Sequence, residues 1–191
     1  MITGFRAGLG GAQGRYGVVP DLTAMGKALA SGLPVGCVAG RRDLMDGIAA
    51  GTVTHAGTFN ATPITMAAAR ATLEHLYAGG DELYGDLEAR GRRLMQGFRE
   101  VIAGHDIPCL VQGLPTIFNL MFTDRTAVRN HREVLMTDKA RRIAFLPYLM
   151  QAGVRISGFG NLFLSDAHTE AVIDETVERF DSALGAFRPT L

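Results

Sequence analysis

Apolar positions in the middle of the chain recur at the spacing of one helical face. From Thr62 to residue 77, small and branched apolar residues repeat every three or four positions. Thr62 suits an N-cap and Pro63 suits the first helical position. After Gly79 and Gly80, a second run, in which charged residues separate the leucines, continues to Gly104. The pattern therefore predicts two successive helices divided at the glycine pair.

The rest of the pattern predicts short strands and further helices. Residues 1–40 are punctuated by glycine and predict short strands and loops. The later expected elements are strands within 107–122 broken at Gly113 and Pro115, a helix at 129–152 interrupted at Pro147, short strands at 154–156 and 162–164, and a capped amphipathic helix at 169–187. Residues from about 83 onward thus predict an α+β unit.

The composition is that of a packed protein without an excess of charge that would attract nucleic acid or a membrane. The chain is 47% hydrophobic and 20% charged, and its nineteen basic residues equal its nineteen acidic ones. This balance predicts neither nucleic-acid nor membrane binding. No signal-peptide pattern opens the sequence, and its most apolar stretch, residues 143–154, is too short to span a bilayer, so we expect a cytoplasmic protein.

Other common chemistries find no support in the residue spacing. The histidines show no paired ligand spacing, so no metal site is expected, and no serine lies in a nucleophile elbow. Cys37 and Cys109 lack metal or disulfide spacing, and we interpret both as core residues.

Lys27 is the most informative single residue. It is one of two lysines in the chain, and its neighbours from Met25 to Leu29 carry no charge. Burial disfavours an ammonium, so an amine buried among these residues would be neutral and nucleophilic more often. That is the requirement of a Schiff-base lysine. The alternative is a structural lysine that extends its charge to water.

Gly57 and Thr58 form a second candidate, a loop just before the helix expected at Thr62. A hydroxyl and unpaired backbone N–H groups could converge there on an anion such as a phosphate. Ordinary turn chemistry explains the same residues. His55 adjoins this loop, and we interpret it as an exposed loop histidine.

Four segments together resemble one enzyme family. They are PDLTAMGKALASGLPVG at residues 20–36, ITGFR at 2–6, HAGTFNATP at 55–63, and the stretch from Gly153 to Thr169 that contains GVRI and FLSDAHT. In their order along the chain they resemble the class III, pyridoxal-phosphate-dependent aminotransferases, in the subgroup like glutamate-1-semialdehyde 2,1-aminomutase. The resemblance covers nearly the whole chain but only the C-terminal half of such enzymes.

The resemblance implies a fold and a domain division. It implies the α/β, fold type I architecture of pyridoxal-phosphate transferases. Residues 1–80 would be the C-terminal part of the large cofactor domain, and residues 81–191 would be the small C-terminal α+β domain.

The resemblance also assigns roles in the site. Lys27 would hold pyridoxal 5'-phosphate as a Schiff base and shuttle a proton during the reaction. Gly57 and Thr58 would contact the cofactor phosphate, and because this loop reaches the neighbouring subunit in the family, Thr58 implies a homodimer. The aspartate that pairs with the pyridine nitrogen, and a further phosphate loop, would lie upstream of Met1.

The implied reaction is amino transfer between an amino acid or amino ketone and a 2-oxo acid or aldehyde, both small molecules. Glutamate-1-semialdehyde 2,1-aminomutase, which makes 5-aminolevulinate for tetrapyrrole synthesis, is the near alternative. Gly160 stands where the aminomutase pattern carries a glutamate, which argues against that alternative. A third possibility, from another class, is a catalytically inactive half-enzyme that acts only as a dimerisation domain.

Overall fold

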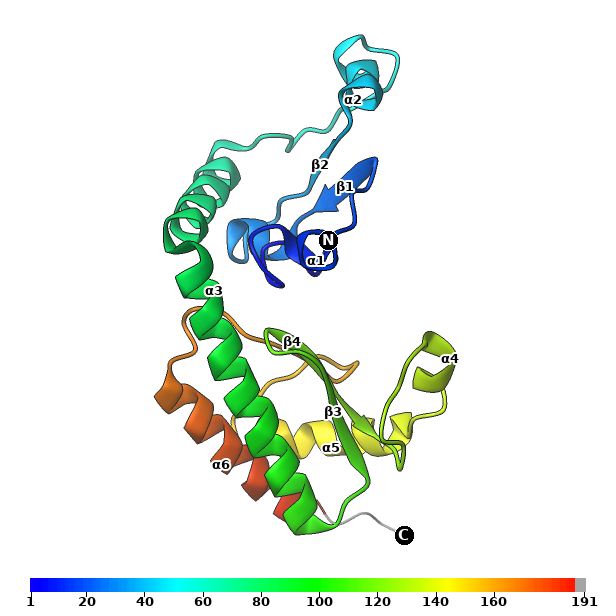
Figure 1. The fold of residues 1–191 in the computed structure, drawn as a ribbon, viewed down its shortest axis with the longest axis vertical. Helices are drawn as coiled ribbons and strands as arrows, with labels where there is room; N and C mark the ends of the chain where they lie inside the picture. The colour runs from blue at the N-terminus through cyan, green and yellow to red at the C-terminus, as the bar shows by residue number, and fades with distance from the viewer. Residues whose placement is uncertain (188–191) are drawn as a thin grey trace. The chain divides into compact units, whose positions relative to one another are not determined.

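The computed structural model describes residues 1–187, and these divide into two compact units (Figure 1). We call Met1–Tyr84 the N-terminal unit and the described residues from Gly85 onward the C-terminal unit. The division falls within helix α3 (Pro63–His105). No helix in the described part of the chain is long and apolar enough to cross a membrane.

The N-terminal unit is built around a two-stranded ribbon. Its elements are helix α1 (Gly11–Tyr16), strand β1 (Leu22–Met25), the 3-10 helix η1 (Lys27–Ala30), strand β2 (Cys37–Gly40), helix α2 (Arg42–Ala49) and the first part of α3. The strands pair antiparallel, with Leu22 opposite Gly40 and Met25 opposite Cys37. Short strands and loops were expected over residues 1–40, but α1 and α2 were not.

Helix α3 follows the sequence prediction closely. It begins at Pro63, and its only non-helical residue is Gly80, with φ 47° and ψ −139°. Glycine adopts a positive φ without the steric cost that a Cβ imposes. The predicted division into two helices at the glycine pair is therefore confirmed as a kink at Gly80.

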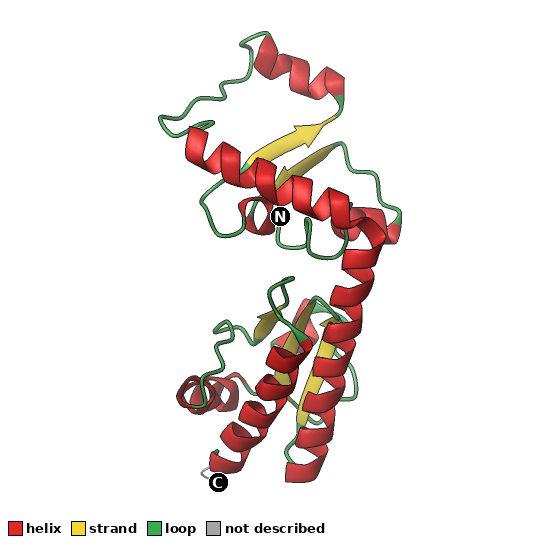
Figure 2. Ribbon diagram, turned by 90° about the vertical axis from the view of Figure 1, so that its left-hand side faces the viewer, coloured by secondary structure: helices red, strands yellow, loops and turns green. Residues whose placement is uncertain are grey.

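A three-stranded antiparallel sheet in the order β3-β4-β5 forms the C-terminal unit. The strands are β3 (Cys109–Leu114), β4 (Ile117–Phe122) and β5 (Asn161–Phe163), and the helices after α3 are α4 (His131–Val134), α5 (Lys139–Gln151) and α6 (Glu170–Ala186). The second part of α3 and α6 run side by side (Figure 2). They approach closely at Gly97, where an added Cβ would lie 2.6 Å from the Cγ2 atom of Val177.

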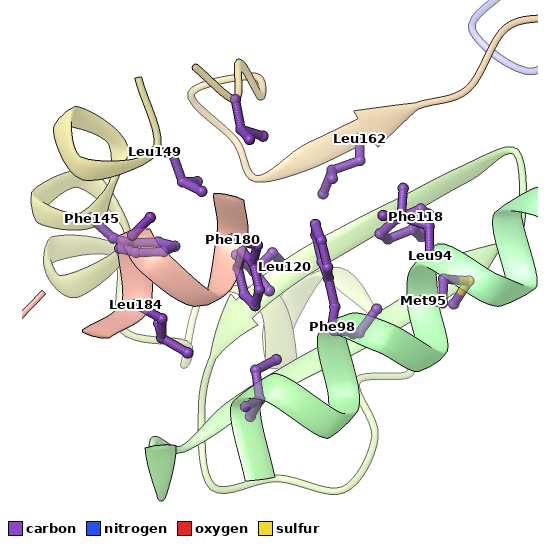
Figure 3. Packing of buried hydrophobic residues seen from close by; sticks show 14 of the residues in the cluster. Leu94, Met95, Phe98, Phe118, Leu120, Phe145, Leu149, Leu162, Phe180 and Leu184 are labelled. Carbon is purple, nitrogen blue, oxygen red and sulfur yellow. The ribbon is translucent and has the colours of Figure 1, made fainter. Parts of the chain in front are cut away.

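Phenylalanine rings dominate the core of the C-terminal unit (Figure 3). The rings of Phe98 on α3 and Phe180 on α6 stack with centroids 4.0 Å apart, and Phe145 of α5 meets Phe180 edge-on at 5.9 Å. Phe145 and Phe180 are completely buried. Each large aromatic removed from water supplies several kcal/mol, about 1.5–3 for a phenylalanine side chain. This unit therefore has a core of its own.

Several local expectations are corrected. Pro147 lies inside α5 instead of interrupting it, and the break comes between α4 and α5, where Asp138 caps α5 by accepting from the N–H of Arg141 at 2.8 Å. Residues 154–156 form no strand, because the N–H of Val154 closes the end of α5 by donating to the carbonyl of Leu149.

The two cysteines differ in their surroundings. Cys37 is exposed, so its assignment to the core was wrong. Cys109 packs against the core of the C-terminal unit, and burial raises the pKa of its thiol to about 12. The described residues contain no cluster of histidine, cysteine and acidic side chains that could hold a metal ion.

Candidate active site

Lys27 stands at the start of η1, one residue after Gly26 and two after the end of β1. Its backbone has φ 55°, in the left-handed region that L-residues rarely occupy. Strain of this kind persists only where the surroundings fix it, and it concentrates at functional sites. Its presence at the lysine singled out from the sequence supports a functional role.

Buried residues on either side fix the Lys27 turn. Leu29 and Ala30 are buried and pack with Ala69 of α3 in the core cluster of the N-terminal unit. The N–H of Leu29 donates to the carbonyl of Gly26 at 3.1 Å, and the hydroxyls of Ser31 and Thr72 lie 3.0 Å apart, which ties the turn to α3. The sequence did not single out these supporting residues.

Gly26 is buried, and its lack of a side chain lets the backbone pass close to the segment that follows η1. An added Cβ would lie 3.1 Å from the carbonyl oxygen of Val35. A larger residue would therefore need the turn or the Val35 segment to shift by a few tenths of an ångström.

The Lys27 side chain is exposed, which corrects the expectation of an apolar, buried amine. Within residues 1–187 it makes no hydrogen bond and no ion pair. The nitrogen is therefore not engaged by any described residue.

Gly57 and Thr58 lie in a fully exposed loop between α2 and α3. The carbonyl of Gly57 accepts from the N–H of Asn60 at 3.0 Å, and the hydroxyl of Thr62 donates to the carbonyl of Phe59 at 2.7 Å. The hydroxyl and N–H of Thr58 make no hydrogen bond within the described residues. These free donors fit an anion, and His55 is exposed beside them, as expected.

Lys27 and the Thr58 loop are not joined to one another. No hydrogen bond in the described part of the chain links η1 to residues 55–60. Each is placed separately, Lys27 by its turn on α3 and Thr58 by the loop that leads into α3.

Gly160 stands where the aminomutase pattern carries a glutamate. In the structure it is tightly enclosed in the C-terminal unit. Its φ is 83°, and an added Cβ would lie 2.5 Å from the carbonyl oxygen of Leu120. The carbonyl of Gly160 also accepts from the N–H of Leu120 at 2.9 Å. This backbone has no room for a glutamate at position 160.

Solved structures with this architecture define the class of protein. An omega-transaminase from Sphaerobacter thermophilus is 29% identical with a TM-score of 0.80, and a beta-phenylalanine aminotransferase from Variovorax paradoxus is 29% identical with a TM-score of 0.81. Each match covers 95% of this chain and 42% of that chain. The fold is that of pyridoxal-phosphate-dependent transaminases, and one transaminase, 26% identical, was solved with pyridoxal phosphate bound.

The chain belongs to the class-III aminotransferase family, whose model matches residues 1–184. Enzymes of this family use pyridoxal phosphate. Among similar curated proteins, glutamate-1-semialdehyde 2,1-aminomutase 2 of Brevibacillus brevis is 40% identical over 181 residues, and glutamate-1-semialdehyde 2,1-aminomutase of Thermomicrobium roseum is 41% identical over 187 residues. The matches cover 93% and 96% of this chain but 42% and 43% of those relatives. The chain thus spans less than half of their length.

Proposed function

We propose that this chain carries the cofactor lysine of a pyridoxal-phosphate-dependent aminotransferase. The observation that supports this proposal most directly is the strained turn at Lys27. The Lys27 side chain has no partner among the described residues, and buried neighbours fix its backbone. The substrates would be small: an amino acid or amino ketone as donor and a 2-oxo acid or aldehyde as acceptor.

The residues present fit pyridoxal phosphate in two places. The Lys27 amine would hold the cofactor covalently, and the free N–H and hydroxyl of Thr58, next to Gly57, would donate to its phosphate. When bound, the cofactor supplies an electron-withdrawing ring that stabilises negative charge on the substrate carbon. Other contacts to the cofactor would come from protein outside residues 1–187.

Lys27 would act in turn as nucleophile, leaving group and base. Its Nζ atom would hold the cofactor covalently, and once a substrate amine had taken that place, Nζ would be free to accept and return a proton at the substrate carbon. The left-handed turn would keep the Cα of Lys27, from which the side chain extends, at one place during these changes. A lysine on a flexible loop would lose that positioning.

Reductive labelling tests this proposal directly, because the chain offers only Lys27 and Lys139 as lysine targets. The purified chain is incubated with pyridoxal phosphate, reduced with borohydride and mapped by mass spectrometry. We expect the label at Lys27, its loss in Lys27→Ala and its retention in Lys139→Ala. Label confined to Lys139, or divided equally between the two lysines, would contradict the proposal for this chain.

A homodimer is part of the same proposal. Thr58 would serve the cofactor of the neighbouring subunit, and the exposure of Phe59 beside it, 85%, supports a loop that another surface covers. Sedimentation equilibrium of the chain and of Phe59→Ser tests this. A wild-type chain that stays monomeric at high concentration would argue against the dimer.

Glutamate-1-semialdehyde 2,1-aminomutase is the second candidate, supported by the names of the curated relatives. The enclosed backbone at Gly160, which leaves no room for a glutamate, favours amino transfer instead. The two are separated by assaying 5-aminolevulinate formation from glutamate 1-semialdehyde beside amino transfer to a 2-oxo acid. Transfer without 5-aminolevulinate would exclude the aminomutase.

An inactive dimerisation domain is the third candidate, supported by the apolar surface of the N-terminal unit. Its core cluster has only Leu29, Ala30 and Ala69 as buried members, whereas Val19 is 95% exposed. Hydrophobic-dye binding and urea unfolding test this candidate. A monomer that binds no dye and unfolds cooperatively would remove its basis.

A further inference from the structure

A cavity of about 430 Å³ lies in the C-terminal unit, between α6, β5 and the segment that joins α5 to β5. All the residues that line it belong to this unit, and neither Lys27 nor Thr58 is among them. Cavities that hold small organic ligands measure roughly 300–1,000 Å³. This cavity therefore has room for a small organic molecule, apart from the residues proposed to hold pyridoxal phosphate.

Much of the cavity wall is apolar and fixed by the core. The lining residues that are also buried members of the core of the C-terminal unit are Leu94, Val154, Leu162, Leu164 and Ile173. A hydrocarbon group in the cavity would therefore leave water for a wall that the fold already holds in place. Each methylene buried in this way strengthens binding by about fourfold.

Two of the charges that line the cavity compensate one another. Arg179 donates from Nε and Nη2 to the Oε1 atom of Glu175, at 3.0 Å and 2.6 Å, and from Nη1 to the carbonyl of Ala152 at 2.7 Å. Glu175 is the one acidic residue that lines the cavity. The pair adds no net charge, and its carboxylate is already engaged, so the cavity is poorly suited to a cation.

Arg155 is the remaining cation of the lining, and nothing in the described chain neutralises it. It is exposed, and within residues 1–187 its side chain makes no hydrogen bond and no ion pair. An exposed arginine alone indicates no ligand, but this one borders a cavity whose other charges cancel. Its guanidinium has the forked donors that match a carboxylate.

His168 adds a second donor to the lining. Its Nδ1 atom accepts from the N–H of Ser165 at 3.0 Å, so the neutral ring carries its proton on Nε2. That Nε2 atom has no partner within residues 1–187. Both free side-chain donors of the lining therefore suit an anion.

From these groups we propose that the cavity binds a small monocarboxylate that has a hydrocarbon tail and no amino group. The carboxylate accepts from the guanidinium of Arg155, and the tail lies against the apolar wall at Leu162 and Ile173. An ammonium group on the ligand would find no free carboxylate, because Arg179 engages that of Glu175. Inorganic phosphate would use the arginine but not the apolar wall. The site requires neither pyridoxal phosphate nor Lys27.

Pentanoate, acetate and norvaline are matched probes. Acetate lacks most of the pentanoate tail, and norvaline is pentanoate with an amino group on carbon 2. The chain with ¹³C-labelled methyl groups is titrated with each at constant pH and ionic strength, and the methyl resonances of Leu162 and Val172, which line the cavity, are followed by NMR. We expect saturable shifts, with pentanoate binding at least about tenfold more tightly than acetate and more tightly than norvaline. Lack of a saturable shift, or equal affinities for pentanoate and acetate, overturns the site, and equal affinities for pentanoate and norvaline overturn the exclusion of an amino group.

Arginine variants separate a specific contact from general attraction. Arg155→Met should weaken pentanoate binding about tenfold, the loss expected for hydrogen bonds between charged groups. Arg132→Met removes the same charge from an exposed position of α4 that does not line the cavity, and it should change the affinity less than about twofold. Equal effects of the two variants would overturn the proposal.

A bulky side chain in the cavity tests where the ligand lies. Val172 lines the cavity and is 37% exposed, so Val172→Phe should fill part of the space without disturbing the core and should abolish pentanoate binding. Ala171→Phe places the same ring one residue earlier, at an exposed position outside the lining, and should leave binding unchanged. Binding of pentanoate to Val172→Phe as tight as to the wild type would show that the ligand lies elsewhere.

Discussion

Replacing Lys27 by glycine and by alanine should separate the strain of the turn from its chemistry. Both variants lose the amine, so both should lose pyridoxal labelling. They differ in backbone freedom: a non-glycine residue in the left-handed region costs roughly 1–2 kcal/mol, whereas glycine pays roughly 0.5–1 kcal/mol in extra chain entropy. With φ at 55°, Lys27→Gly should therefore leave the turn about 0.5–1 kcal/mol more stable than Lys27→Ala does.

Hydrogen exchange at the amide of Leu29 measures this difference locally, because that N–H closes the turn on the carbonyl of Gly26. A difference of about 0.5–1 kcal/mol corresponds to about twofold to fivefold slower exchange in Lys27→Gly than in Lys27→Ala. Ala28→Gly is the matched control, since Ala28 lies in the same turn without a positive φ. There glycine should speed exchange by a similar factor.

The opposite signs at adjacent positions make the test decisive. Equal exchange in Lys27→Gly and Lys27→Ala, or faster exchange in the glycine variant, would refute the strained turn. The main structural support for a functional Lys27 would then be lost.

Three further predictions concern the C-terminal unit and the cysteines. Gly91→Ala should lower the free energy of unfolding, measured by urea denaturation followed by circular dichroism, by about 1–3 kcal/mol, because the added Cβ would lie 2.2 Å from the carbonyl oxygen of Pro115. Gly85→Ala, in the same helix with open space around it, should raise that free energy by up to about 1 kcal/mol. Phe180→Ala should cost about 3–5 kcal/mol in the same assay, since its ring is completely buried, and a loss below about 1 kcal/mol would contradict the described core. With a thiol-specific reagent at pH 8, the exposed Cys37 should react quickly. Cys109 is partly buried and its pKa is raised to about 12, so it should stay a neutral thiol and react far more slowly until the chain unfolds; equally fast reaction of both would contradict this difference.

Elements defined by local signals could be predicted from the sequence. Pro63 begins α3 and Gly80 breaks it, and the cap at Thr169 accepts from the N–H of Val172 at the start of α6. The signals involved are the fixed φ of proline, the freedom of glycine and the side-chain oxygen of threonine. All act within a few residues, so no tertiary information was needed.

Elements that depend on packing could not be predicted in this way. Pro147 was expected to interrupt a helix, but α5 continues through it, with Phe145 and Leu149 buried on either side. The burial of these neighbours compensates for the hydrogen bond that proline cannot make. The sequence also could not predict that the buried Nε atom of Arg142 lacks a hydrogen-bond acceptor among the described residues, because this depends on which atoms the fold brings next to it.

At Lys27 the sequence indicated the residue of interest but not the environment of its side chain. Its rarity and the motif around it marked the residue, and the structure adds a strained, anchored backbone. The apolar neighbours in sequence did not become apolar neighbours in space, since Leu29 and Ala30 turn into the core while the amine faces outward. Burial that would favour a neutral amine therefore has to come from the bound cofactor or from a protein surface outside residues 1–187. The chain fixes the backbone of Lys27 by itself, and the proposed reactivity of its nitrogen requires an environment that another surface completes.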